Sequence, residues 1–287
     1  MPNTLLAHLI LFIFTLHVLA ANTSYVGYLI SNFSDKNPTV QWYLSEGNDP
    51  STYTFLNKGQ PILESTVGTK AVRDVFLVTN SARNEWFMIC TEDPTGGMLW
   101  APSAHWDSST SQYDLFWSTQ LYSPADTSHR GTASLKRIRH ATTKDFITFS
   151  APTDYLAPSG VSIIDQEFLP LEQPGHYARF YKDETAGSRV VIEISTDGLF
   201  GTWKRVGNVR SEGRREGAAA FADNVVPGRY YVFLDDYTQY LPFVTENISA
   251  VPWGVPNWSG FPRGLKHGSV TALTREEYDA VASQYLA

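Results

Sequence analysis

Apolar residues along this chain gather in short runs separated by polar turns, and this pattern predicts strands rather than helices. Residues 72–78 form one such run, in which an Arg-Asp pair precedes an apolar, β-branched segment. Residues 163–169 and 215–221 repeat the design, with an acid ahead of an apolar strand, and aromatic strands return at residues 86–89, 177–181 and 230–234. A carboxylate at the start of a buried strand is unfavourable unless it forms an ion pair, accepts hydrogen bonds or has a role in a functional site. Three acids in equivalent places therefore indicate a candidate carboxylate site.

A weak internal repeat of about fifty residues runs through the chain. Each unit contains a strand end with a Ser or Thr hydroxyl, a polar turn, and an aromatic strand that returns. The hydroxyl positions are Ser45, Thr91, Thr142, Ser195 and Thr245, which are 46 to 53 residues apart. Five such units predict an all-β protein, a five-bladed β-propeller with four strands in each blade. A β-sandwich with an appended domain is the alternative, and it explains the strands but not the even spacing.

The predicted propeller brings the three acids together. Asp74 and Asp165 are 91 residues apart, about two blades, and Glu216 follows 51 residues later, about one blade. Equivalent innermost strands line the central channel, so we expect the three side chains to meet there, from the first, third and fourth blades. Residues 25–31 and 269–273 are expected to complete one blade and close the ring, and residues 274–286 to form a short helix.

The N-terminal segment predicts secretion. Residues 5–20 are almost wholly apolar, a run that is short for a membrane span and ends in small residues suited to signal peptidase. We expect a signal peptide over residues 1–20, whose removal leaves a single extracellular propeller domain over residues 21–287; a membrane anchor is the alternative. Four sequons would carry glycans in a eukaryotic host, and they start at Asn22, Asn32, Asn247 and Asn257.

Composition narrows the class of partner. The 287 residues carry a formal net charge of −7, which argues against nucleic acid as the main partner. Hydrophobic residues make up 43% of the chain, enough for a substantial core, and the 14% of aromatic residues is typical of all-β folds and sugar-stacking surfaces. Cys90 is the only cysteine, so no internal disulfide can form, and we expect a buried, inert thiol. We expect a monomer without membrane contact once the signal peptide is removed.

Five short motifs in order give the chain a likeness to a known family. They are Gly-Thr-Lys-Ala-Val-Arg-Asp at 68–74, Trp-Ala-Pro at 100–102, Ile-Asp at 164–165, Arg-Glu-Gly at 215–217 and Lys-His-Gly-Ser-Val at 266–270. From about residue 25 to about residue 274 the sequence resembles glycoside hydrolase family 43, the five-bladed arabinosidase and xylosidase-like enzymes. Many relatives have Pro where Val75 stands and an acid where Ser103 stands, which leaves the identity of the substrate open.

The resemblance implies a role for each matching residue. Asp74 matches the general base that activates water, Asp165 the aspartate that orients the acid and tunes its pKa, and Glu216 the general acid. Trp100 matches an aromatic wall of the substrate pocket. His267 matches a histidine that contacts a metal ion or its water shell in some relatives. No cofactor is required, and a structural calcium or sodium ion in the central channel is the metal that the resemblance implies.

These roles form a coherent chemistry. Glycoside cleavage needs one carboxyl protonated and one ionised at the same pH, and a third carboxylate near the acid raises its pKa by like-charge repulsion. Inverting enzymes hold acid and base roughly 6.5–9.5 Å apart, which leaves room for a water between base and sugar. Opposite sides of a narrow channel can supply that separation.

Each acid also has an alternative that the sequence leaves open. Asp74 has a neighbour, Arg73, with which it would form a simple ion pair. The other two have competing acids nearby along the chain, which are Glu167 for Asp165 and Glu212 for Glu216.

The sequence therefore predicts a secreted inverting glycoside hydrolase that acts on a polysaccharide or oligosaccharide. It would remove furanosyl or xylosyl units, with arabinofuranosidase, xylosidase or galactofuranosidase-like specificity. One alternative is a catalytically impaired, carbohydrate-binding propeller, which the changes at Val75 and Ser103 leave open, although the presence of all three acids favours the enzyme. Another is a propeller used for protein contacts, which would not require the three acids.

Overall fold

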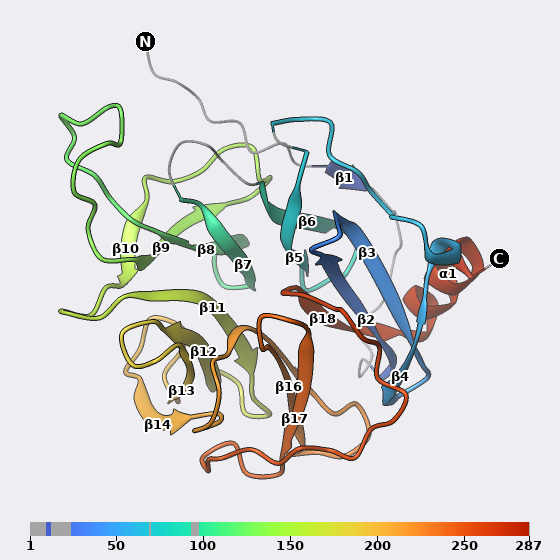
Figure 1. Ribbon diagram of the computed structural model, residues 1–287. Helices are drawn as coiled ribbons and strands as arrows, with labels where there is room; N and C mark the ends of the chain where they lie inside the picture. Colours follow the sequence, from blue (N-terminus) through green and yellow to red (C-terminus); the bar gives the residue numbers. More distant parts are fainter. Residues whose placement is uncertain (1–9, 13–23, 69, 93–97, 287) are drawn as a thin grey trace.

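The computed structural model describes residues 10–12, 24–68, 70–92 and 98–286, and in them five antiparallel sheets surround one axis (Figure 1). The predicted five-bladed β-propeller is confirmed. Four strands were expected in every blade, but among the described residues only three sheets have four strands and the other two have three.

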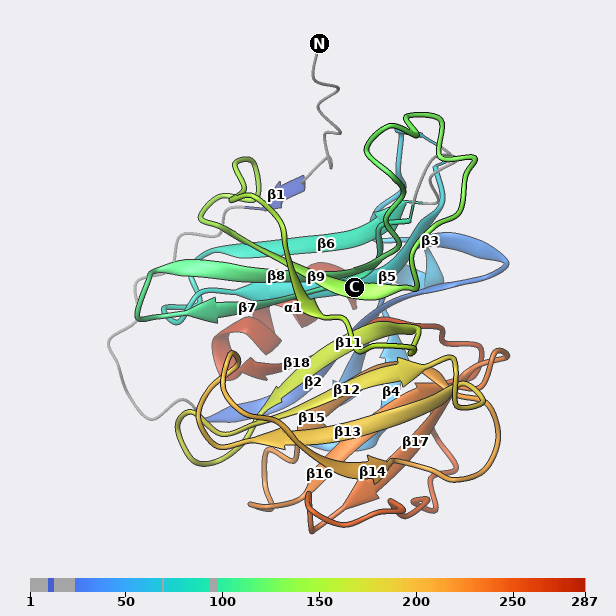
Figure 2. The same cartoon turned by 90° about the vertical axis from the view of Figure 1, so that its left-hand side faces the viewer.

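Each blade runs outward from an inner strand. The first blade holds β5 (Val72–Thr79) and β6 (Trp86–Glu92), with β1 (Ile10–Phe12) outside them. The second holds β7 (Trp100–Asp107), β8 (Gln112–Thr119), β9 (Arg137–Thr143) and β10 (Thr153–Leu156). The third holds β11 (Ile163–Pro170), β12 (Tyr177–Asp183), β13 (Arg189–Ser195) and β14 (Lys204–Asn208), and Figure 2 shows these strands side by side. The fourth holds β15 (Glu216–Ala222), β16 (Tyr230–Asp235) and β17 (Tyr240–Thr245), and the fifth β18 (Ser269–Thr274), β2 (Tyr25–Ser34), β3 (Asn37–Glu46) and β4 (Asp49–Phe55).

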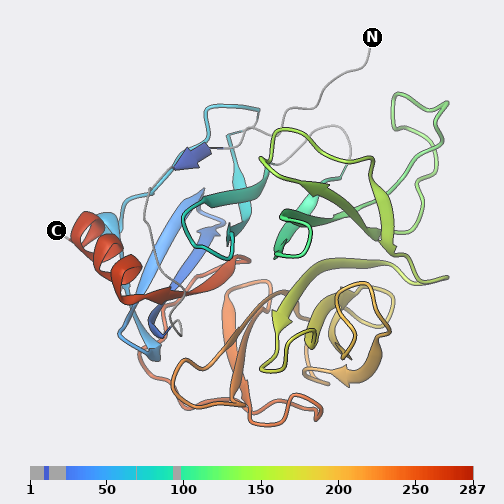
Figure 3. The ribbon, with the colours of Figure 1, turned by 180° about the vertical axis from the view of Figure 1, so that it is seen from behind.

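The ring closes where the two ends of the propeller meet in the fifth blade. β18 pairs with β2, with Val270 opposite Ile30, as the sequence predicted. The 3-10 helix η1 (Asn57–Gly59) follows β4, and α1 (Arg275–Tyr285) follows β18 and packs against this blade (Figure 3). The Tyr278 hydroxyl of α1 donates to the Ser45 carbonyl at 2.7 Å, which ties the helix to β3.

The repeat that predicted the blades corresponds to their third strands. The hydroxyl residues at 45, 142, 195 and 245 lie on β3, β9, β13 and β17, each the third strand from the axis. Thr91 was aligned with them wrongly, because it lies on β6, the second strand of its blade. The next strand along the chain, β7, already belongs to the second blade, and β1 takes the third place in the first.

Apolar side chains fill the space between neighbouring blades. Phe180, Val232 and Trp253 lie in the cluster between the third and fourth blades, and each is 1% exposed or less. Tyr28 and Phe233 lie in the cluster between the fourth and fifth blades and are fully buried. This packing fixes the blades around the axis and thereby fixes the inner strands relative to one another.

Four of the inner strands carry a β-bulge at the same level. The strands β5, β7, β11, β15 and β18 contact their neighbours around the axis, and the first four have a register shift near their beginning. The bulged residues with left-handed backbone are Asp74, Ala101, Asp165 and Gly217, at φ values of 50°, 48°, 57° and 57°. A bulge re-aims the side chains beside it, so these strands are shaped for a site at this end of the axis.

The predicted signal peptide lies largely outside the described residues, which include only positions 10–12 of its span. Those three residues form β1 and pair with residues 86–88 of β6. Among the described residues no helix has the length and apolar character needed to cross a membrane. Secretion stays a prediction.

Two predictions about single residues were wrong. Cys90 is exposed rather than buried, and it lies past residues 86–88 of β6, which pair with the described residues of β1. Asn32 is completely buried on β2, so its sequon is inaccessible in the folded protein. Asn247 and Asn257 are exposed and stay predicted glycosylation sites, and Asn22 lies outside the described residues.

Candidate active site

A pocket of about 380 Å³ opens at the axis, at the level where the inner strands begin. Its lining includes all five residues singled out from the sequence, which are Asp74, Trp100, Asp165, Glu216 and His267. Four of them lie on β5, β7, β11 and β15, and the histidine lies two residues before β18. All five inner strands, or the segments that lead into them, thus contribute to one pocket.

The bulges decide how each acid enters the pocket. Asp74 and Asp165 are themselves the left-handed residues of their bulges, a backbone region that aspartate tolerates better than most residues. Gly217 holds the equivalent place in β15, so Glu216 stands one residue earlier than the other two acids. The prediction of equivalent places is therefore right for two acids and wrong for Glu216.

Asp74 lies between a histidine and a backbone amide. Its Oδ1 is 3.4 Å from His267 Nδ1, and its Oδ2 accepts a hydrogen bond from the Ala101 N–H at 3.3 Å. Burial raises the pKa of Asp74, but the hydrogen bond and charge of His267, with contributions from Thr91 and Arg73, outweigh burial and hold this pKa below its usual range. Asp74 is therefore ionised at neutral pH, the state that a general base requires.

His267 is the cation opposite Asp74. Burial lowers the pKa of His267, but the hydrogen bond and charge of Asp74 and the charges of Asp165 and Glu167 raise it overall to about 9. The ring lies against the backbone of Gly217, where an added Cβ would be 2.7 Å from the ring Cγ. Glycine is thus required at this position both by its φ of 57° and by the ring that packs on it.

Asp165 shows the opposite protonation behaviour. Its side chain is buried, and its Oδ2 accepts a hydrogen bond from the Gly217 N–H at 3.2 Å. Burial raises the pKa of Asp165, His267 lowers it, and the negative charges of Glu216 and Asp74 raise it again, to about 7. A carboxyl that exchanges its proton near neutral pH thus lies beside Glu216.

Glu216 is held by a buried lysine from the third blade. Lys182 Nζ donates to Glu216 Oε2 at 2.6 Å and lies 5.2 Å from the centre of the Tyr237 ring. Burial lowers the pKa of Lys182, but its bonds to Glu216 and Tyr237 and the charge of Asp165 raise it well above its usual range. The Glu216 side chain is 24% exposed, and with Oε2 on the lysine it is Oε1 that can face a bound sugar.

The contacts of the competing residues decide between the alternatives. Arg73 Nη2 lies 3.4 Å from Asp35 Oδ1, and its guanidinium lies over the Phe33 ring, so Arg73 is not simply the partner of Asp74. The two competing acids do not line the pocket. Glu167 is buried and accepts from the Ala220 N–H, and Glu212 is 83% exposed.

Trp100 forms part of the pocket wall and is 36% exposed. The ammonium of Lys136 lies 5.2 Å from its ring centre. The two positions where the chain departs from the family, Val75 and Ser103, do not line the pocket. Val75 is fully buried in the core, and Ser103 Oγ donates to the Gln166 carbonyl at 2.9 Å. The two departures from the family therefore lie in the packing behind the pocket and not among the side chains that line it.

The sequence reasoning assigned no role to two lysines of the pocket. Lys182 pairs with Glu216, and Lys266 Nζ donates to Asp235 Oδ1 at 2.9 Å with both side chains buried. A lysine is almost never buried without a partner. The signal available in the sequence was Lys182 itself, which directly follows the aromatic run at residues 177–181. The whole segment forms β12, in which six of seven residues are buried.

The metal ion implied by the family resemblance is not supported by the side chains that surround His267. Among the described residues no three His, Cys, Asp or Glu side chains are arranged to hold a metal. The Nδ1 of His267 faces Asp74 at 3.4 Å, so this nitrogen is already engaged by a carboxylate. An ion elsewhere in the channel stays a prediction, and no chemical step is derived through it.

Comparison with known proteins identifies the family and supports the fold. The chain matches, over residues 23–93 and 91–279, a family related to glycoside hydrolase family 43 and described as a probable glycosyl hydrolase domain. A curated α-L-arabinofuranosidase of Bifidobacterium longum subsp. longum is 23% identical over 59% of this chain. The match covers 20% of that protein, so the chain spans about a fifth of its relative.

Two solved structures cover nearly the whole chain. The α-L-arabinanase of Penicillium chrysogenum, complexed with arabinobiose, gives a TM-score of 0.51 at 12% identity over 94% of this chain and 90% of that chain. The family 93 α-L-arabinofuranosidase of Fusarium graminearum, also with arabinobiose, gives 0.49 at 13% identity over 94% and 91%. At these identities the arabinanase likeness supports the fold alone. The family match covers most of the chain, which therefore belongs to this glycoside hydrolase family related to family 43.

Proposed function

We propose that this chain is a secreted, inverting glycoside hydrolase that removes furanosyl or xylosyl units from a polysaccharide or oligosaccharide. The observation that carries the proposal is the contrast between two carboxyls of one pocket. Asp74 is ionised beside His267, whereas Asp165 has a pKa raised to about 7 next to Glu216. Glycoside cleavage requires an ionised base and a protonated acid at the same pH. Asp74 is in the state of the base, and Asp165 keeps a proton up to about pH 7 beside Glu216, the residue proposed as the acid.

In the proposed reaction Asp74 accepts a proton from a water molecule. That water attacks the anomeric carbon on the face opposite the leaving group, while Glu216 gives its proton to the glycosidic oxygen as the C–O bond breaks. Lys182 on Oε2 directs the other oxygen of Glu216 toward the leaving group. Where Asp165 is ionised, above about pH 7, its negative charge opposes ionisation of the neighbouring acid. The product forms with inverted configuration.

The proposed substrate class has two supports. The relatives named above act on arabinose-containing substrates, as their names state. The pocket volume of about 380 Å³ is at the lower end of small-ligand sites, which favours removal of single sugar units against the Trp100 wall. Secretion is supported by the apolar run at residues 5–20. N-terminal sequencing of the exported protein would test that prediction.

A panel of aryl α-L-arabinofuranosides, β-D-xylosides and β-D-galactofuranosides tests the proposal. We expect release of the aryl alcohol from at least one of them, loss of that activity in Asp74→Asn, and retention of it in the exposed control Glu212→Gln. Proton NMR of the nascent sugar should show inversion. Retention of configuration would mean a covalent intermediate and would overturn the assignment of Asp74 as base.

The second candidate is a catalytically impaired propeller that binds carbohydrate. The Lys182–Glu216 ion pair favours it, because it occupies one of the two oxygens of the acid. This candidate predicts that arabino- or xylo-oligosaccharides perturb the Trp100 environment in solution while no member of the aryl panel is cleaved.

A further inference from the structure

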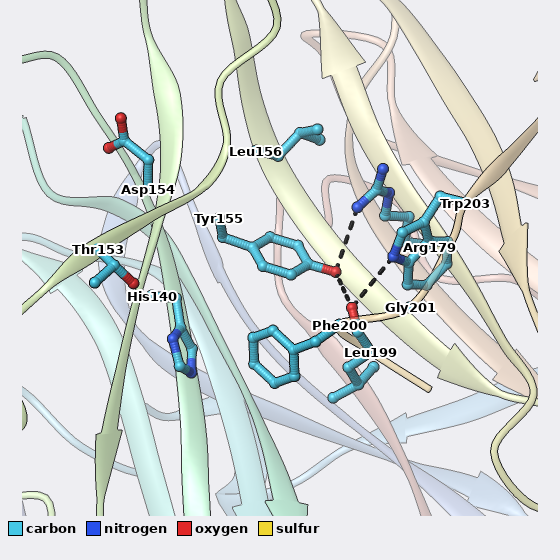
Figure 4. Close-up of a pocket in the computed structure, with 10 residues that line it drawn as sticks. All are labelled: His140, Thr153, Asp154, Tyr155, Leu156, Arg179, Leu199, Phe200, Gly201 and Trp203. Atoms are coloured by element: carbon cyan, nitrogen blue, oxygen red, sulfur yellow. Dashed lines mark hydrogen bonds between the residues drawn. The ribbon is translucent and has the colours of Figure 1, made fainter. Parts of the chain in front are cut away.

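A second pocket, of about 430 Å³, lies at the outer rim of the propeller between the second and third blades. Its walls are β9 and β10 of the second blade and, from the third, β12 and the segment 199–203 between β13 and β14 (Figure 4). It shares no lining residue with the pocket at the axis, so it is a separate feature of the surface.

The walls of this inter-blade pocket are held rigid by hydrogen bonds across the two blades. The Tyr155 hydroxyl donates to the Leu199 carbonyl at 2.6 Å, and Trp203 Nε1 donates to the same oxygen at 3.2 Å. Arg179 Nη1 donates to the Tyr155 hydroxyl at 3.3 Å (Figure 4). Side chains that are fixed before a ligand arrives lose little freedom on binding, which favours affinity.

The charges around the inter-blade pocket are already compensated. Arg179 pairs with Glu193, and its guanidinium lies 4.3 Å from the Trp203 ring centre. Asp154 pairs with Arg137 at 2.8 Å and with Arg139 at 2.9 Å, which leaves one positive charge over. The carboxylate of Asp114, 2.8 Å from His140, offsets that charge, so the pocket suits a neutral ligand.

Aromatic rings give the pocket its character. Phe200 is 61% exposed, and its ring stands edge-on to His140 at 4.9 Å and to Tyr155 at 5.7 Å. An exposed ring that stands against other aromatic rings in the lining of a pocket offers a face on which the apolar side of a ligand can pack. Polar groups of Thr153 and Asp154 lie in the same lining. An apolar ring face with hydrogen-bonding groups around it matches a sugar, which has an apolar C–H face and an edge of hydroxyls.

We propose that the inter-blade pocket is an accessory binding site for a neutral saccharide unit, which stacks on Phe200 and bonds through its hydroxyls to Thr153. The site would hold a polymer chain at the rim of the propeller, away from the carboxylates at the axis. It rests on its own contacts and does not depend on hydrolysis at the axial pocket.

Affinity electrophoresis in native gels that contain arabinan, xylan or β-1,3-galactan tests the proposal. We expect at least one polysaccharide to retard the wild-type protein, and Phe200→Ala to weaken this retention about threefold to tenfold, the range expected for one aromatic contact. Phe149→Ala is the matched control, because Phe149 is an exposed phenylalanine near β10 that does not line the pocket. Equal melting temperatures would show that both variants fold.

Three outcomes would overturn the proposal. They are no retention of the wild-type protein by any of the polysaccharides, equal retention of Phe200→Ala and Phe149→Ala, and a response to nucleosides instead of sugars. The third outcome is measured by NMR, as a shift of the Trp203 indole N–H signal when nucleosides or sugars are added. The variant Trp203→Phe assigns that signal. Hydrolysis of a small aryl glycoside should be the same in wild type and Phe200→Ala. Retention lost in Phe200→Ala from a protein without hydrolase activity would support this site and refute the proposed function.

Discussion

Asp74 and Asp165 occupy the same place in two blades and have opposite electrostatic environments. Each is the left-handed residue of a bulge near the start of an inner strand, and each lines the axial pocket. His267 holds the pKa of Asp74 below its usual range, whereas burial and the charge of Glu216 contribute to a pKa of about 7 for Asp165. The repeat therefore sets where the two carboxyls lie but not which of them keeps a proton.

The difference between the two aspartates comes from residues that the repeat does not contain. His267 belongs to the segment before β18, and it reaches Asp74 at 3.4 Å. Gly217 contacts both environments, because its N–H donates to Asp165 and the His267 ring packs on its backbone. A repeated scaffold can thus carry different chemistry at equivalent positions when single side chains from other blades approach them.

The largest effect is expected from Asp74→Asn, which removes the proposed base. Activity should fall about a thousandfold on aryl glycosides and on natural oligosaccharides alike, because water attack is needed in either case. Asp236→Asn is the control, since Asp236 bonds to the turn at residues 238–239 and does not line the pocket. Steady-state kcat/KM on both substrate types provides the measurement, and a loss limited to natural substrates would contradict a role as base.

Glu216→Gln should have a smaller effect that depends on the leaving group. A natural sugar alcohol leaves poorly and needs protonation, so its hydrolysis should fall about a hundredfold, whereas a dinitrophenyl glycoside should lose less than about tenfold. Glu212→Gln, four residues earlier and 83% exposed, should match the wild type. Equal losses on both leaving groups would show that Glu216 is not the acid.

Gly217→Ala tests the residue that separates the two aspartates. The alanine would have an unfavourable positive φ, and its Cβ would collide with the His267 ring. We therefore expect a loss of stability of about 2 kcal/mol or more, together with lower kcat. Gly160→Ala is the matched control, because Gly160 has φ of 74° and open space around its Cβ direction. Thermal unfolding and kcat compare the two, and equal destabilisation would show that the His267 contact contributes nothing.

The propeller and the position of the acids could be predicted because both follow from local sequence patterns. Strand runs at a spacing of about fifty residues specify blades, and an acid before such a run specifies a side chain near the axis. Glu216 stands one residue earlier than the two aspartates because the left-handed residue of its bulge is Gly217. That His267 and Lys182 are the partners of the acids could not be predicted, since each contact joins different blades.

The smallest effect on rate, and the sharpest on pH, is expected from Asp165→Asn. The asparagine amide oxygen can still accept the Gly217 N–H, so the pocket should keep its shape. The negative charge that opposes ionisation of the acid is lost, and the alkaline limb of the kcat/KM profile should move to lower pH, with about a tenfold loss at neutral pH. A limb that stays in place would contradict coupling between Asp165 and Glu216.

Stability gives an independent view of the same carboxyl. The pKa of Asp165 rises from 3.8 to about 7 on folding, so the folded state binds more protons between these values and the carboxyl's contribution to stability falls as the pH rises through that window. Asp165→Asn lacks this ionisation. The variant should match the wild type near pH 4 and become progressively more stable than it up to about pH 7. The charge of Asp165 also contributes to the raised pKa of His267, which is about 9, so the melting temperatures are compared only between pH 4 and 7. A difference that shrinks with rising pH would mean that Asp165 is ionised and stabilised by its cations, as Asp74 is.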